Sequence, residues 1–221
     1  MRYKAIVYAI KWLAERGVKT AAYMSRVIDT LVRDLYNGVI ESDEFNTELA
    51  DLIENQFRRA FNEGMRNNGL DPAKDMTDEW EAEYQRMVTA QYEFIERFAK
   101  DILEGSEKGQ SKDEFMARAD LWANQYESVV NEAQLITADK KQKYKWTLGA
   151  TEEHCSTCSR LNGIIAYAEE WEQAGFHPQR PPNELLECGG WRCDCSLEPT
   201  DKRRTADALG ILLDIAASVN V

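Results

Sequence analysis

The residues of this chain that are best suited to chemistry all lie between positions 150 and 199. Every cysteine and every histidine of the 221-residue sequence is there: Cys155, Cys158, Cys188, Cys193 and Cys195, with His154 and His177. Cysteines that serve only as small core hydrophobes are expected to scatter among the elements of a fold. Their confinement to one segment instead indicates a site that binds through sulfur.

The spacing of the cysteines predicts a four-coordinate zinc site built from two chain segments. Cys155 and Cys158 form a Cys-x-x-Cys pair, and Cys188, Cys193 and Cys195 follow as Cys-x4-Cys-x-Cys. Zinc removes the protons of such thiols and binds them as anions. We expect the first pair to supply two ligands and two of the later three cysteines to complete the site. Two disulfides with one spare thiol, or a set of inert thiols, are the alternatives.

Neighbouring residues suggest how the later cysteines reach the first pair. Gly189 and Gly190 permit a tight bend after Cys188. If residues 191–197 are extended, Cys193 and Cys195 point to the same face, because side chains alternate along a strand.

The two histidines have different expected roles. His177 is a candidate substitute for one cysteine ligand, although Pro178 follows it in a loop. His154 adjoins Cys155, and we expect it to be solvated or to contact a ligand.

Long amphipathic helices precede this segment. Apolar residues recur at three- and four-residue steps over residues 3–36 (with a break near Gly17), 43–67, 78–104 and 111–136. Such stripes are typical of the seams of a helical bundle. The predicted fold is therefore mainly α, with a helical domain over residues 1–140, a small α+β zinc-knuckle module over 141–200 and a tail over 201–221.

The module is expected to contain short elements. Residues 143–148 and 164–167 are predicted strands, residues 169–174 a short helix, and residues 191–197 a strand beside 143–148. So small a unit is expected to need a metal for stability. The apolar end of the chain predicts a helix that docks on the bundle or on another protein.

Composition and missing motifs exclude several classes of protein. The formal net charge is −12, which argues against nucleic-acid binding. The short basic runs at 140–145 and 202–204 are expected to be solvated. The first residues are expected to form a helix and not a targeting signal, and the sequence has no apolar run of membrane-spanning length. We find no zinc-deaminase, metalloprotease or phosphate-loop motif.

The same segment resembles the C-terminal module of the phage Mu F-like minor head proteins, also described as phage head morphogenesis proteins. Four features carry the resemblance: a Trp/Thr strand, a Cys-x-x-Cys pair, a Leu-x-Gly turn and closing cysteines. Here they are residues 145–148, Cys155 with Cys158, residues 161–163, and Cys188 with residues 192–199. The closing triplet is Cys193-Asp194-Cys195, with Arg192 one place earlier than in the family pattern.

The resemblance implies a non-enzymatic virion protein with a structural zinc ion. Such a protein lies in the head near the portal, binds portal, major capsid or other head proteins, and is in the host cytoplasm during assembly. A zinc-dependent enzyme, such as a nuclease or toxin-like effector, is the alternative from another class. A zinc-ribbon regulator that binds nucleic acid is a weaker third hypothesis.

Overall fold

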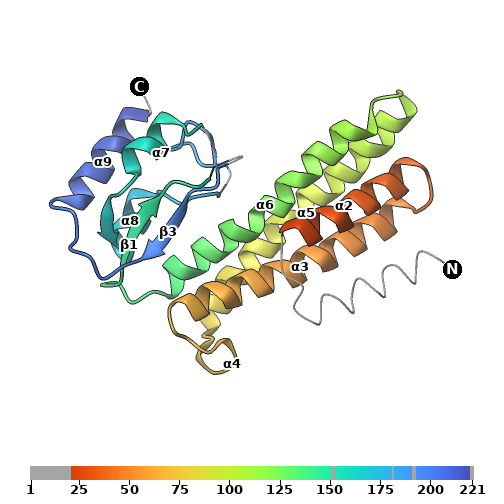
Figure 1. Ribbon diagram of the computed structural model, residues 1–221. Helices are drawn as coiled ribbons and strands as arrows, with labels where there is room; N and C mark the ends of the chain where they lie inside the picture. The colour runs from red at the N-terminus through yellow and green to blue at the C-terminus, as the bar shows by residue number, and fades with distance from the viewer. Residues whose placement is uncertain (1–20, 151–152, 181, 191–192, 220–221) are drawn as a thin grey trace. The chain divides into compact units, whose positions relative to one another are not determined.

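The computed structural model describes residues 21–150, 153–180, 182–190 and 193–219 (Figure 1). It confirms the predicted fold class, because long helices dominate and the sheet has three short strands. The helix expected over residues 3–17 lies outside the described residues. Two compact units are present, Met1–Gln56 with Arg86–Tyr126, and Phe57–Gln85 with Glu127–Val221. The boundaries expected at residues 140 and 200 stay a prediction.

Four long helices follow the apolar stripes of the sequence. They are α2 (Ala21–Tyr36), α3 (Ser42–Asn67), α5 (Asp78–Glu107) and α6 (Lys112–Thr137), so most expected ends are correct to within three residues. The one-turn helix α4 (Pro72–Asp75) was not expected. Its first turn is capped by Asp71, whose side chain accepts a hydrogen bond from Ala73 N, and proline is well suited to the first helical position.

The first unit is a helical core centred on aromatic side chains. Phe98 of α5 packs between Phe45 of α3 and Trp122 of α6, with ring centroids 6.2 and 5.0 Å away. The indole N–H of Trp122 donates to Gln91 Oε1 at 3.1 Å. Met24, Ile28 and Leu35 of α2 are fully buried, as their stripe predicts.

The second unit contains the other halves of α3, α5 and α6. Gly64 of α3 lies against α6, where an added Cβ would be only 2.6 Å from both Ala133 Cβ and Val130 O. Glycine therefore permits a close approach of these two helices. On α5, the ring of Tyr84 packs edge-on to Phe61.

The sheet has the strand order β2-β1-β3, and both pairs are antiparallel. The strands are β1 (Lys143–Thr147), β2 (Ile165–Tyr167) and β3 (Ser196–Pro199). The first two agree with the sequence prediction, and β3 does lie beside β1. However, β3 begins at Ser196, so the prediction of a strand over residues 191–197 was wrong in its bounds.

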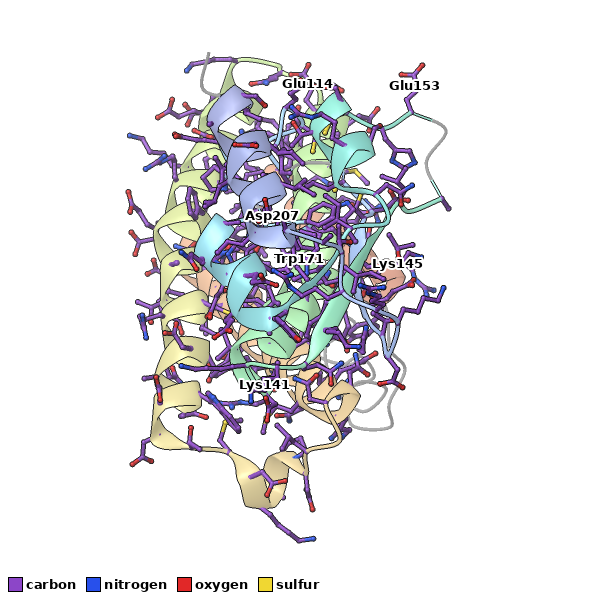
Figure 2. All side chains as sticks on the ribbon, turned by 90° about the vertical axis from the view of Figure 1, so that its left-hand side faces the viewer. Glu114, Lys141, Lys145, Glu153, Trp171 and Asp207 are labelled. Carbon is purple, nitrogen blue, oxygen red and sulfur yellow. The ribbon has the colours of Figure 1, made fainter. Side chains whose placement is uncertain are left out.

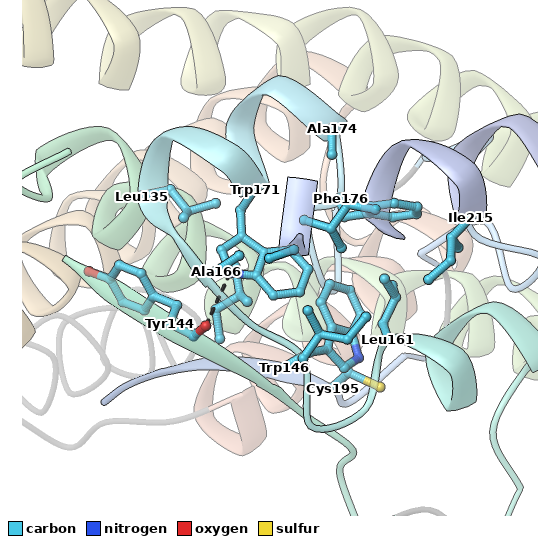
Figure 3. Packing of buried hydrophobic residues seen from close by; sticks show 14 of the residues in the cluster. Leu135, Tyr144, Trp146, Leu161, Ala166, Trp171, Ala174, Phe176, Cys195 and Ile215 are labelled. Carbon is cyan, nitrogen blue, oxygen red and sulfur yellow. Dashed lines mark hydrogen bonds between the residues drawn. The ribbon is translucent and has the colours of Figure 1, made fainter. Parts of the chain in front are cut away.

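Around this sheet a second core forms from aromatic and aliphatic residues (Figures 2 and 3). Trp146 of β1 and Trp171 of α8 (Ala168–Ala174) are fully buried, with ring centroids 5.7 Å apart. The Trp171 indole N–H donates to Tyr144 O at 3.1 Å, the dashed line in Figure 3. The basic runs are solvated only in part: Lys141 is exposed, but Lys143 is half-buried and donates to Asp201 O at 2.9 Å, and Arg204 pairs with Glu170.

The last helix, α9 (Ala208–Val219), completes this core. Ala208, Leu212 and Ile215 are buried in the same cluster as the two tryptophans. The expectation that the tail docks on the helical bundle was therefore wrong, because its apolar face covers the module. Ile211 and Leu213 remain exposed on α9.

A buried amide connects the sheet to α6 within the second unit. Gln134 Nε2 donates to Leu197 O at 3.1 Å, and Gln134 Oε1 accepts from Asn67 Nδ2. The Tyr144 hydroxyl donates to Asn68 Oδ1 at 2.5 Å and lies 3.2 Å from Gln134 O. Burial raises the pKa of Tyr144 to about 12. These hydrogen bonds position β1 and β3, which flank the cysteine segments.

Candidate metal centre

The first cysteine pair is formed by the start of a short helix. Cys155 is the residue before α7 (Ser156–Leu161), and Cys158 lies in its first turn. The backbone N–H of Cys158 points at the Cys155 sulfur, with N and Sγ 3.4 Å apart. The helical turn thus brings both sulfurs of the Cys-x-x-Cys pair to one side. The helix α7 therefore includes Cys158.

Cys188 reaches the pair through a tight loop. Gly189 and Gly190 adopt φ of 62° and 79°, which supports the bend predicted from the two glycines. Glu187, beside Cys188, accepts hydrogen bonds from the backbone and hydroxyl of Ser156, the former at 3.0 Å. These bonds lower the pKa of Glu187 and clamp the loop to the start of α7.

Cys193 and Cys195 arrive on the chain just before β3. The sulfurs of Cys158, Cys193 and Cys195 all lie within 4.8 Å of one another, as do those of Cys155, Cys158 and Cys188. Both later cysteines therefore lie beside Cys158, although they precede the strand and are not part of it. Cys158 belongs to both groups and is the centre of the cluster.

The distances suit a metal and not a disulfide. Zn–S bonds of about 2.3 Å place the sulfurs of a tetrahedral site about 3.8 Å apart, and a disulfide needs about 2.05 Å. The sulfurs of Cys158 and Cys193 are 3.9 Å apart, and all five thiols are free. The cluster lies within metal-binding distance, and thiolates are ligands that zinc accepts.

The sulfurs also influence each other's protonation. Contacts with Cys188, Cys193 and Cys195 raise the pKa of Cys158, whereas contact with Cys158 lowers the pKa of Cys193. Contacts with Cys158 and Cys193 lower the pKa of Cys195 to about 4. Thiolates are therefore already favoured within the cluster, and a cation would displace the remaining proton.

Two groups that support Cys195 were missed in the sequence. The indole nitrogen of Trp146 lies next to the Cys195 sulfur (Figure 3), and both this N–H and the backbone N–H of Gly149 help to lower the Cys195 pKa. The same indole nitrogen makes no hydrogen bond to another described oxygen or nitrogen. Only the proximity of the Lys145–Leu148 motif to the cysteines could have suggested these roles.

His177 is placed away from the groups of potential ligands that the described residues form. Its Nδ1 lies 2.8 Å from Glu132 Oε2 on α6, and Arg180 Nη1 donates to Glu132 Oε1 at 2.6 Å. Burial alone would raise the pKa of Glu132, but contacts with His177 and Arg180 lower it. The suggestion that His177 replaces a cysteine ligand was therefore wrong: it orders a loop on α6.

His154 is closer to the site than a merely solvated residue would be. The potential ligand atoms of His154, Asp194 and Cys195 all lie within 4.8 Å of one another. Asp194 was not singled out in the sequence, because its position depends on how residues 193–195 fold back.

No family model, curated protein or solved structure matches this chain. Among the helices of the described residues, none has the length and apolar character needed to span a membrane.

Proposed function

We propose that this chain is a non-enzymatic phage minor head protein that binds portal or capsid protein during virion assembly. The proposal is supported by the way in which the separate parts of the sequence motif come together in space. The end of β1, the Cys155 pair, the turn at Gly163 and the closing cysteines belong to one small module, and four such features in one order are typical of that family. The long helices that precede the module suit an assembly role, since they offer extended surfaces to partners.

The proposed ion is structural Zn2+, bound by four of the five cysteines, with Cys155 and Cys158 among them. Zinc binds thiolates in closed tetrahedral sites that stabilise folded modules. Here it would tie α7 to two segments that lack helix or strand, residues 182–190 and 193–195. The hydrogen bonds between Ser156 and Glu187 would then orient the loop that carries Cys188.

The proposed partner is the portal, with the major capsid protein or other head proteins as further candidates. The place of action is the head near the portal, after assembly in the host cytoplasm. The test is to co-express the chain with the portal protein of the same phage and to count copies in purified particles by mass spectrometry. A few copies per particle and a complex with the portal are expected. A chain that is absent from particles and does not bind the portal would refute the proposal.

A zinc-dependent enzyme, such as a nuclease, is the second candidate. One observation favours it: His154 and Asp194 place an imidazole and a carboxylate beside the thiolates, and hydrolytic metal sites use such groups. The zinc-loaded chain should be incubated with single- and double-stranded DNA and RNA. No cleavage is expected. Cleavage that requires zinc and disappears in Cys158→Ser would replace the assembly proposal by this one.

A further inference from the structure

The sulfur cluster continues on one side into nitrogen and oxygen donors. His154, Asp194 and Cys195 have ligand atoms within 4.8 Å of one another, and Cys195 also belongs to the group of Cys158 and Cys193. His154 directly precedes Cys155, and Asp194 separates the two closing cysteines. The segments that bring the thiols together therefore also assemble this mixed group.

Counting ligands shows that the donors exceed what one ion can use. A tetrahedral ion takes four ligands: Cys155, Cys158 and Cys188 form one group, and Cys193, which lies within 4.8 Å of Cys158, would complete it. Cys195 is then left with an imidazole and a carboxylate, all of them donors that zinc accepts. A thiolate shared with the first ion, or a water molecule, would supply a fourth ligand.

We propose that His154, Asp194 and Cys195 bind a second divalent ion of the zinc type beside the four-thiolate ion, so that the module holds a two-metal cluster. This inference rests on the proposed structural zinc. The second ion has fewer thiolate ligands, and His154 and Asp194 are only partly buried, so it is accessible to solvent. It therefore binds more weakly than the first ion and exchanges faster.

The test is the number of zinc ions per chain. The full-length protein is saturated with Zn2+, freed of excess ion by gel filtration, and measured by elemental analysis. The wild type is expected to hold two ions and the double variant His154→Ala/Asp194→Asn one. Competition with a colorimetric chelator should release one ion quickly and one slowly from the wild type, and only the slow one from the variant.

Two control variants separate ligand loss from unspecific effects. Glu153→Gln removes an exposed carboxylate beside His154 that extends away from the module (Figure 2), and His177→Ala removes the other histidine; both should keep two ions. A wild type that saturates at one ion overturns the second site and leaves the structural zinc standing. A wild type with no ion refutes both. A double variant that keeps two ions also overturns the inference.

A measurement on the wild type covers the case in which the double variant does not fold. Stepwise addition of Co2+ should give strong thiolate charge-transfer absorption with the first equivalent. The second equivalent should add a distinct spectrum with a weaker contribution of this kind, because it has fewer sulfur ligands. Saturation of all absorption at one equivalent would overturn the second site.

Discussion

Gly149→Ala should weaken the metal site, although Gly149 is not itself a ligand. A Cβ at this position would lie 2.0 Å from Asp194 Cγ and 2.3 Å from the backbone oxygen of Asp194. A rotation of the Asp194 side chain removes only the first clash, so the backbone between Cys193 and Cys195 must move. We expect the strain to cost about 1–3 kcal/mol of unfolding free energy, a typical value for overpacking. Displaced ligands should also reduce zinc affinity by about 10- to 100-fold, as for other disturbed supports of a metal.

The matched control is Gly163→Ala in the same module. Gly163 has φ of 83°, and an added Cβ would meet no atom within 4 Å. This variant should lose about 1 kcal/mol through backbone strain, with zinc affinity unchanged. Zinc affinity is measured by competition with a colorimetric chelator, and stability by urea unfolding. Equal zinc affinities for the two variants would refute the argument that residues 149 and 193–195 together shape the site.

Three further variants test separate contacts. Trp146→Phe keeps an aromatic ring in the core but removes the N–H beside the Cys195 sulfur. Chelator competition should then show a zinc affinity about tenfold lower. An unchanged affinity would show that Trp146 does not support the site. Tyr144→Phe removes the hydroxyl bound to Asn68 and should cost about 1 kcal/mol in urea unfolding; an additive double variant with Asn68→Ala would contradict a direct coupling. In the folded chain the pKa of Glu132 lies below its ordinary value. The ion pairs of Glu132 therefore stabilise the folded chain fully at pH values above the ordinary carboxyl range. This stabilisation is lost as the pH falls through the lowered pKa of the folded chain. The stability gap between wild type and Glu132→Gln should therefore be widest at neutral pH and shrink on acidification, and a gap independent of pH would refute this.

The helices were predictable because their signals are local. The stripe over residues 43–67 depends on neighbours three and four residues away, and α3 begins and ends almost where expected. The cysteine spacing likewise predicted which residues meet, since a Cys-x-x-Cys turn has few conformations that place both sulfurs together. The prediction of a bend after Cys188 was also correct, because Gly189 and Gly190 are a local signal for a bend.

What the sequence could not provide depends on long-range packing. The strand over residues 191–197 was placed too early because Cys193–Cys195 turn toward α7 and do not continue the ladder. His177 looked available as a ligand because its partner, Glu132, is 45 positions away on α6. Asp194 and Trp146 carry no motif of their own, and their roles arise only from the fold of the chain around Cys195.

The most direct test of the account is hydrogen exchange of the zinc-loaded chain before and after chelation, with the zinc content measured on the same sample. The account predicts bound zinc, and after its removal much faster exchange in α7 and in residues 183–189, while the amides of α2 exchange as before. A chain that contains no zinc after purification in its presence, or whose α7 and 183–189 segments stay equally protected without it, would contradict the account.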